Sequence, residues 1–381
     1  MRARPDARRL HARLLKLDGH LDAPIHFTRR GWSFADRHVH GTEIAQLDLP
    51  RMAGNLDGGF FVVYTPQGPL TADGYAIALS TARQRSNEID DAVARLPALG
   101  LARTAADAER LHAEGRTIVF KSMENSYPLG EDLTILGEFS KRGVRLAGPV
   151  HSRTNQLADS ATDAPRWNGL SPLGKRWVAE MNRLGIVIDP SHASDAAFDD
   201  MLALSSTPLL LSHSGSRHGF DTPRNLDDAR LKALAVAAGV IGFTTIFLSE
   251  LRASPERFAL LKRLDDIGTL SPDDQQALTT RWRELDAEEP MWSADFDDYM
   301  RTLLHVIDVA GVDHVAFGAD FDGGGGVPGL EDVTALPKIT DRLLAEGFGE
   351  DDLAKLWGGN ILRVLRSAEQ AATPGPYLDR N

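Results

Sequence analysis

Eight short runs of apolar, often β-branched residues recur along the chain, separated by segments of helix length. Such runs are typical of strands that are buried on both faces, and strand alternating with helix predicts a parallel sheet. Ser194 stands directly before one helical segment and is predicted to be its N-cap. The predicted strands are 16–22, 59–64, 117–121, 144–150, 185–189, 208–212, 240–245 and 314–319. The predicted helices include 76–96, 104–114, 171–184, 194–204 and 226–238.

Eight strand–helix repeats favour an α/β fold closed into a (β/α)8 barrel, or TIM barrel, over an open doubly wound sheet. The length of 381 residues alone would suggest two or three domains, but the strand count predicts a single barrel domain spanning 1–381. Residues 246–300, which are charged and poor in strand character, are expected to form extra helices between strands 7 and 8. Residues 369–381 contain two prolines and are expected to form a surface tail.

The composition excludes several kinds of site. The chain has no cysteine, so disulfides, thiolate metal sites and a cysteine nucleophile are ruled out, and any metal must be held by His, Asp or Glu. With 42 Lys and Arg against 54 Asp and Glu, the net charge is −12. This acidic balance argues against a nucleic-acid partner, which requires clustered positive charge.

No export signal or membrane anchor is recognisable in the sequence. Residues 1–20 lack the apolar core of a signal peptide, and the longest uncharged stretch, 233–249, is shorter than the roughly 20 residues of a membrane span. A cytoplasmic location is therefore expected, the alternative being an exported protein whose signal has been removed. Residues 246–300 could also form the contact of a homodimer.

Polar side chains gather where the predicted strands end. In a barrel of this kind, active sites lie at the carboxyl ends of the strands. His20 and Asp22 are two residues apart on the first strand, so their side chains point to the same side. Four of the 12 histidines fall at predicted strand ends. The end-of-strand residues are His20, Asp22, Lys121, Glu124, His151, His192, His213 and Asp320, followed by Asp322.

Each of these residues alone could be structural, but their convergence indicates a metal site. Imidazole and carboxylate ligands suit zinc, and also manganese, cobalt or iron. A single catalytic zinc uses three protein ligands, and the chain offers more. Two metals that share a bridging ligand fit the number better. That bridge would come from Glu124 or from a carboxylated Lys121.

Several short motifs carry a resemblance to a known family. The chain resembles the membrane dipeptidase (renal dipeptidase) family of dinuclear zinc peptidases, as a bacterial-type member, over roughly residues 16–366. The barrel would then be of the amidohydrolase type. The motifs are Asp18-Gly19-His20-Leu21-Asp22, Gly59-Phe60-Phe61-Val62-Val63-Tyr64, Met123-Glu124-Asn125, His151-Ser152-Arg153-Thr154-Asn155, Asp189-Pro190-Ser191-His192, Ser212-His213-Ser214, Pro223-Arg224-Asn225 and Gly318-Ala319-Asp320-Phe321-Asp322.

The resemblance implies how two Zn²⁺ ions per chain, or other divalent metals, would be held. His20 and Asp22 would bind one zinc, and His192 and His213 the other. Glu124 would bridge the two ions, so the resemblance favours Glu124 over Lys121 as the bridging ligand. A hydroxide between the ions would attack the peptide bond of a small dipeptide, including dipeptides with a D-residue at the C-terminal position.

The resemblance also implies the residues that meet the substrate. His151 would bind the substrate carbonyl and stabilise the oxyanion, and Asp320 would transfer the proton. Arg224 would bind the C-terminal carboxylate, and Tyr64 would line the pocket. The alternative function is an amidohydrolase acting on N-acyl amino acids or β-lactams. A barrel that only binds its ligand is disfavoured by the complete set of ligands.

Overall fold

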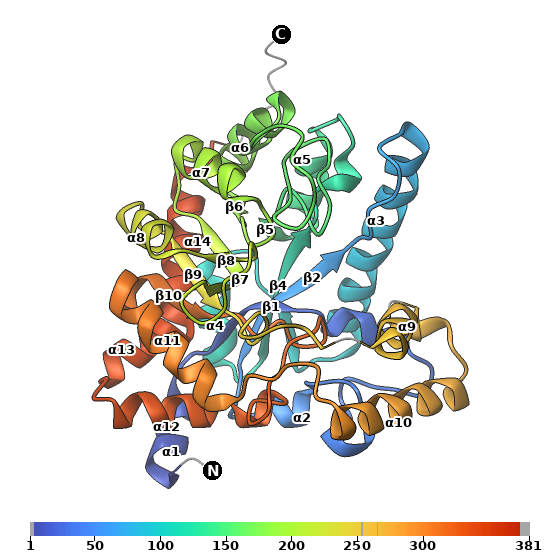
Figure 1. Ribbon diagram of the computed structural model, residues 1–381, viewed down its shortest axis with the longest axis vertical. Helices are drawn as coiled ribbons and strands as arrows, with labels where there is room; N and C mark the ends of the chain where they lie inside the picture. Colours follow the sequence, from blue (N-terminus) through green and yellow to red (C-terminus); the bar gives the residue numbers. More distant parts are fainter. Residues whose placement is uncertain (1–3, 253, 265, 374–381) are drawn as a thin grey trace.

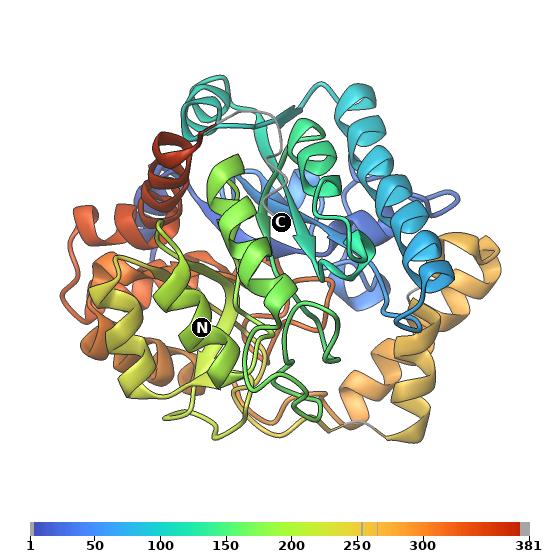
Figure 2. The ribbon, with the colours of Figure 1, turned by 90° about the horizontal axis from the view of Figure 1, so that it is seen from above.

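A parallel sheet lies at the centre of the molecule and is curled like a barrel, with helices around it (Figures 1 and 2). The computed structural model describes residues 4–252, 254–264 and 266–373. The strands are β1 Leu17–Leu21, β2 Gly58–Tyr64, β3 Leu99–Leu101, β4 Thr117–Glu124, β5 Val144–Ala147, β6 Val187–Ile188, β7 Leu210–Ser216, β8 Asn225–Leu226, β9 Val240–Phe243 and β10 Val315–Phe317. This architecture confirms the predicted TIM-barrel class.

The strands follow the order β6-β5-β4-β2-β1-β10-β9-β7-β8, and β3 pairs with β4. Every pairing among these strands is parallel. β6 and β7 are neighbours, but no ladder joins them within the described residues. The carboxylate of Asp189, just after β6, instead accepts a hydrogen bond from the backbone N–H of Ser212 in β7, at 3.0 Å. A side chain thus connects the two strands where the ladder is missing.

All eight predicted strands are present, and their ends differ from the prediction. β4 extends three residues beyond residue 121 and ends at Glu124, while β5 ends at Ala147, three residues before residue 150. β6 has only two residues. The additional strands β3 and β8 are two or three residues long, too short to show a sequence period.

The helices that follow the strands agree with the predicted segments, and their caps set their starts. α3 begins at Ala72 because the Thr71 side chain accepts from the N–H of Gly74. The Ser194 side chain caps α7 by accepting from the N–H of Ala197, as predicted. The helices between β1 and β9 are α2 Leu49–Met52, α3 Ala72–Arg95, α4 Ala105–Ala113, α5 Ile135–Lys141, α6 Pro172–Leu184, α7 Asp195–Leu204 and α8 Asp228–Val236, and α1 Pro5–Arg13 precedes β1.

In the described part of the segment between β9 and β10 lie three α-helices, as expected for residues 246–300: α9 Pro255–Leu264, α10 Pro272–Glu288 and α11 Phe296–Ala310. α9 and α10 pack together at one side of the sheet, away from α11 (Figures 1 and 2). α12 Pro337–Ala345, α13 Glu350–Ala354 and α14 Asn360–Ala371 complete the chain. The first residues of the expected tail, 369–371, are therefore helical, and 374–381 lie outside the described residues. No helix in the described part is both long and apolar enough to cross a membrane.

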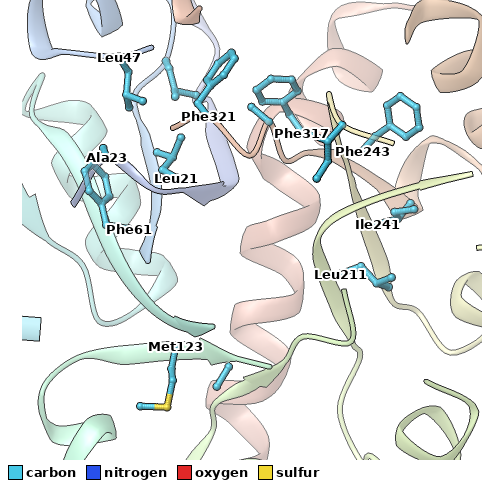
Figure 3. Close-up of a cluster of buried hydrophobic side chains, with 14 of the residues drawn as sticks. Leu21, Ala23, Leu47, Phe61, Met123, Leu211, Ile241, Phe243, Phe317 and Phe321 are labelled. Carbon is cyan, nitrogen blue, oxygen red and sulfur yellow. The ribbon is translucent and has the colours of Figure 1, made fainter. Parts of the chain in front are cut away.

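The main core is formed by side chains that the strands direct toward the surrounding helices. Leu21, Phe61, Met123, Phe243 and Phe317 come from five different strands and are buried together (Figure 3). Burial of large apolar side chains contributes most of the stability of such a sheet. It holds the carboxyl ends of the strands in place, where the polar residues gather.

Candidate metal centre

β1 and β4 bring one imidazole and two carboxylate groups together. His20 lies in β1 and Asp22 directly follows it, and His20 Nε2 is 3.3 Å from Asp22 Oδ2. The predicted placement of the two side chains on one side is therefore confirmed. Glu124 is the last residue of β4, and its Oε2 lies 3.7 Å from His20 Nε2.

The other oxygen of Glu124 faces a second pair of histidines. Glu124 Oε1 lies 2.8 Å from His192 Nε2 and 3.7 Å from His213 Nε2. His192 is in the loop after β6, four residues past its end, whereas His213 lies within β7 rather than at its end. The predicted strand 208–212 ended too early. The strand continues through the polar sequence Ser212-His213-Ser214, which is buried inside the barrel.

Arg224, which directly precedes β8, lies against this second pair. Its Nη2 is 3.2 Å from the Nε2 atoms of both His192 and His213. Its side chain is buried, and its Nε and Nη1 have no hydrogen-bond partner within the described residues. A buried guanidinium with two unsatisfied donors is suited to receive a carboxylate.

Asp320 reaches the cluster from the loop after β10. Its Oδ1 lies 3.8 Å from His20 Nε2. Asp320 has a φ of 59°, a left-handed conformation that is uncommon for residues with a side chain and that recurs at functional turns. A Cβ at Gly323 would collide with the carboxylates of Asp22 and Asp320, so a side chain there would displace these two groups. Gln46 Nε2 donates to the Gly325 carbonyl at 2.7 Å and fixes this loop.

His151 and Tyr64 lie at the edge of the same cluster. His151 was predicted at a strand end, but β5 ends four residues earlier and the following loop carries it. Its Nε2 is 3.7 Å from Glu124 Oε1. The ring of Tyr64, which is paired with Glu124 in the β2–β4 register, lies edge-on to His151 at 5.1 Å between centroids.

Lys121 points away from the cluster. Its ammonium group donates to the carbonyl and hydroxyl oxygens of Ser86 in α3, at 3.0 and 3.1 Å, and lies 2.7 Å from Asp90. Its side chain is therefore directed toward a helix, and the alternative of a carboxylated Lys121 as a bridging ligand is wrong.

Sequence reasoning did not identify the groups that orient the histidines. The Ser212 hydroxyl donates to Asp189 Oδ2 at 2.5 Å. It lies 2.8 Å from His213 Nδ1 and 3.2 Å from His20 Nδ1. Since the hydroxyl proton is directed to Asp189, its oxygen can accept from both Nδ1–H groups, which turns each Nε2 toward the cluster. The sequence feature that could have identified them is the presence of two polar residues, Ser212 and Asp189, within apolar predicted strands.

The electrostatics of the cluster favour a bound cation. Burial lowers the pKa of His20, but the carboxylates of Glu124, Asp22 and Asp320 outweigh it and raise that pKa to about 10. Burial raises the pKa of Glu124 to about 8 and that of Asp320 well above its usual range. Burial lowers the pKa values of His192 and His213 well below theirs. A divalent cation bound between these groups would favour their deprotonated forms, which are the forms that bind metal.

The geometry of the donor atoms also fits metal ions. Three groups have ligand atoms that all lie within 4.8 Å of one another: His20, Asp22 and Glu124; Glu124, His192 and His213; and His20, His213 and Asp320. The Nε2 of His20 is buried without a hydrogen-bond partner in the described part of the chain. A buried imidazole nitrogen without a hydrogen-bond partner is an expected metal ligand. The residues present therefore fit a metal centre.

A cavity of about 720 Å³ opens onto this cluster. Asp22, Glu124, His192, His213 and Asp320 line one part of it. Tyr64, His151 and Arg224 line it as well. The predicted site residues other than His20 and Lys121 thus surround one space large enough for a small molecule.

Comparison with known proteins agrees with this chemistry. A family model described as membrane dipeptidase, peptidase family M19, matches residues 4–376. The dipeptidase tcpJ of Claviceps purpurea is 29% identical over 93% of this chain and 77% of its own length. The crystal structure of the probable dipeptidase PvdM of Pseudomonas aeruginosa is 30% identical, with a TM-score of 0.81 over 96% of this chain and 98% of its own.

A third relative is a metallopeptidase of Rhodobacter sphaeroides, solved with a phosphinate mimic of the dipeptide L-Ala-D-Ala. It is 27% identical, with a TM-score of 0.73 over 93% of this chain and 99% of its own. The family match covers nearly the whole chain and includes every residue of the metal centre. The chain therefore belongs to the membrane dipeptidase family, peptidase family M19, and is a hydrolase of the metallo-dipeptidase class.

Proposed function

We propose that this enzyme hydrolyses the peptide bond of dipeptides with two zinc ions per chain. His20 and Asp22 would hold one ion, His192 and His213 the other, and Glu124 would bridge them. One observation carries this proposal: the two carboxylate oxygens of Glu124 face different histidine groups, Oε2 toward His20 and Oε1 toward His192 and His213. A carboxylate placed between two sets of ligands is suited to bridge two ions.

When bound by these residues, the metal ions would supply Lewis acidity and would make hydroxide available near neutral pH. The chain's own residues orient the dipeptide and handle its charge. Arg224 binds the free carboxylate through the donors that lack a partner in the described residues. The distance from Arg224 to the metal ligands is fixed. The peptide bond that is cleaved must therefore lie one residue away from the free carboxylate, and this spacing selects dipeptides.

His151 and Asp320 act on the reacting atoms. Burial, and then the charge of Arg224, lower the pKa of His151 to about 3, so it is neutral near pH 7. The Ser152 hydroxyl oxygen lies 3.0 Å from His151 Nδ1; with that hydroxyl as the donor, His151 would carry its proton on Nε2 and would donate a hydrogen bond to the developing oxyanion. Asp320 accepts a proton and delivers it to the leaving amine. Tyr64 lines the cavity beside His151.

The experiment that tests this proposal measures metal content and substrate class together. We expect the zinc-reconstituted protein to contain two zinc ions per chain by elemental analysis. We expect it to hydrolyse L-Ala–L-Ala or L-Ala–D-Ala faster than N-acetylalanine or a cephalosporin. The D-configured substrate is included because the Rhodobacter sphaeroides relative binds a mimic of L-Ala-D-Ala. Fewer than one zinc per chain, or a preference for N-acetylalanine or the β-lactam, would contradict the proposal.

The contacts of Ser212 predict a specific loss of metal affinity. In Ser212→Ala, the Nδ1 groups of His20 and His213 lose the hydroxyl that orients both rings. Removal of such a supporting hydrogen bond to a metal ligand lowers metal affinity by about 10- to 100-fold, so we expect at least a tenfold weaker zinc affinity. Competition with a chromophoric chelator measures it on the purified protein.

Ser214→Ala is the matched control for this variant. Ser214 lies on the other side of His213 in the same strand and is equally buried, but its hydroxyl has no hydrogen-bond partner in the part of the chain that is described. We expect its zinc affinity to remain at the wild-type value. Equal zinc affinity in Ser212→Ala and Ser214→Ala would show that the hydroxyl of Ser212 does not orient the histidines.

A further inference from the structure

The cavity extends well beyond the metal centre, and several apolar side chains line this extension. Phe247, Leu261, Trp282, Met291 and Trp292, which come from the segment between β9 and α11, line this part. The total volume of about 720 Å³ is in the range that holds a drug-sized ligand, and a dipeptide of two alanines would fill only a fraction of it. The site therefore offers apolar space that a minimal dipeptide leaves unused. We refer to these five residues as the aromatic wall.

The aromatic wall begins at the residue proposed to bind the carboxylate. The Arg224 guanidinium carbon lies 5.1 Å from the centroid of the Phe247 ring. Phe247 in turn packs edge-on against Trp292, with 5.7 Å between ring centroids. A carboxylate held by Arg224 therefore has its neighbouring carbon atom next to an aromatic surface.

Trp292 also connects the aromatic wall to the loop that carries Asp320. Its indole Nε1 donates to the carbonyl of Gly324, at 2.9 Å, in the same loop that carries Asp320. The wall thus has a fixed position relative to the carboxylate site at one end and to Asp320 at the other. A substrate side chain that packs against the aromatic wall would hold the substrate in a defined orientation at the metal centre.

The charged groups at the far end of the cavity already have partners. Arg283 Nη1 donates to Asp286 Oδ2 at 3.0 Å, and its Nε donates to the Glu43 carbonyl at 3.0 Å. Asp286 also accepts from Arg257, at 2.8 Å. Because these charges are paired, the far end does not favour a charged side chain over an apolar one.

We propose that the aromatic wall binds the side chain of the substrate residue that carries the free carboxylate, and that the enzyme prefers dipeptides whose C-terminal residue is large and apolar. The inference rests on the proposed function and specifies its substrate class. The side chain of that residue starts at the carbon beside the carboxylate, and Arg224 places this carbon next to Phe247. Apolar side chains gain binding energy by leaving water for this surface.

Two series of dipeptides test the preference with the zinc-loaded enzyme. One series is Ala–X and the other X–Ala, where X is Ala, Leu, Phe or Trp, each with L- and D-residues at the C-terminal position. A hydrophobic pocket discriminates by about tenfold or more for each well-buried methylene. We expect kcat/KM to rise at least about tenfold from Ala–Ala to Ala–Phe, and to stay nearly constant across X–Ala.

Variants of α9 locate the effect. Leu261 is half-buried and faces the cavity, so Leu261→Asp places a charge in the wall far from the reacting atoms. We expect it to lower kcat/KM for Ala–Phe about tenfold or more beyond any change in kcat/KM for Ala–Ala. Phe258, on the same helix, is 56% exposed and does not line the cavity, so Phe258→Asp should change neither value.

Three results would overturn the inference. Equal kcat/KM for Ala–Ala and Ala–Phe would show that the wall does not bind the C-terminal side chain, while dipeptide hydrolysis itself would stand. A rise across X–Ala instead would assign the wall to the other residue of the dipeptide. Failure to hydrolyse any dipeptide in either series would remove the proposed function and, with it, this inference.

Discussion

Replacing Asp320 with Asn is expected to lower kcat for dipeptide hydrolysis by about 10²- to 10⁴-fold, the usual contribution of general acid–base catalysis. Asp320 Oδ1 lies 3.8 Å from His20 Nε2 in the cluster, and its side chain is buried. An amide has nearly the same shape as the carboxylate but cannot accept and return a proton. The loss should therefore appear in kcat, with both zinc ions retained. Steady-state kinetics and elemental analysis of the same preparation measure the two quantities.

Asp322→Asn is the control for this variant. Asp322 lies two residues away in the same turn, but its Oδ1 faces His26 Nε2, at 3.4 Å, and accepts from the N–H of Gln46 at 2.7 Å. An asparagine oxygen can still accept from Gln46, so we expect kcat near the wild-type value. Loss of a zinc ion in Asp320→Asn would identify Asp320 as a ligand, consistent with its grouping with His20 and His213, and would contradict the proton-transfer role.

The sequence allowed the cluster to be predicted where a local rule applied. His20 and Asp22 are two residues apart on one strand, and the alternation of side chains sufficed to place them together. Glu124, His192, His213 and Asp320 could be expected nearby because the carboxyl ends of parallel strands meet at one end of a barrel. That argument needs only the approximate strand positions, and errors of a few residues at strand ends did not affect it.

The features that depend on contacts between distant segments could not be predicted. The side chain of Lys121 is directed to Ser86 of α3, a choice that the sequence left open. His151 reaches Glu124 from a loop rather than from a strand end. The link from Asp189 to Ser212 exists because β6 and β7 lack a ladder in the described residues, and no sequence period marks such a gap.

The aromatic wall also could not be predicted from the sequence. Residues 246–300 were expected to form extra helices between strands 7 and 8 or the contact of a homodimer, and their charge gave no sign of an apolar inner surface. α9 and α10 turn only part of their surface toward the cavity, and Leu261 and Trp282 are among the residues that line it. Which face of such a helix is inward depends on its packing partners, and α10 packs not only on α9 but also on residues 40–43, far away in the sequence.

Replacing Arg224 with Ala is expected to raise KM for dipeptides strongly, with a smaller effect on kcat. Truncating one partner of a buried, hydrogen-bonded charge pair costs about 2–5 kcal/mol, which corresponds to roughly 30-fold or more in affinity. The guanidinium is buried beside His192 and His213, and its Nε and Nη1 lack partners in the described residues. Initial-rate kinetics over a wide range of dipeptide concentration measure the change.

A dipeptide with an amidated C-terminus separates loss of the carboxylate contact from general damage to the site. The wild-type enzyme should bind the amide about as poorly as Arg224→Ala binds the free acid, and the variant should not distinguish the two substrates. Arg217→Ala is the matched control, because Arg217 pairs with Asp195 at 2.8 Å and does not line the cavity. If Arg224→Ala still discriminated fully between the acid and the amide, the carboxylate would have to be bound elsewhere. The selection of dipeptides by a fixed cation would then be wrong.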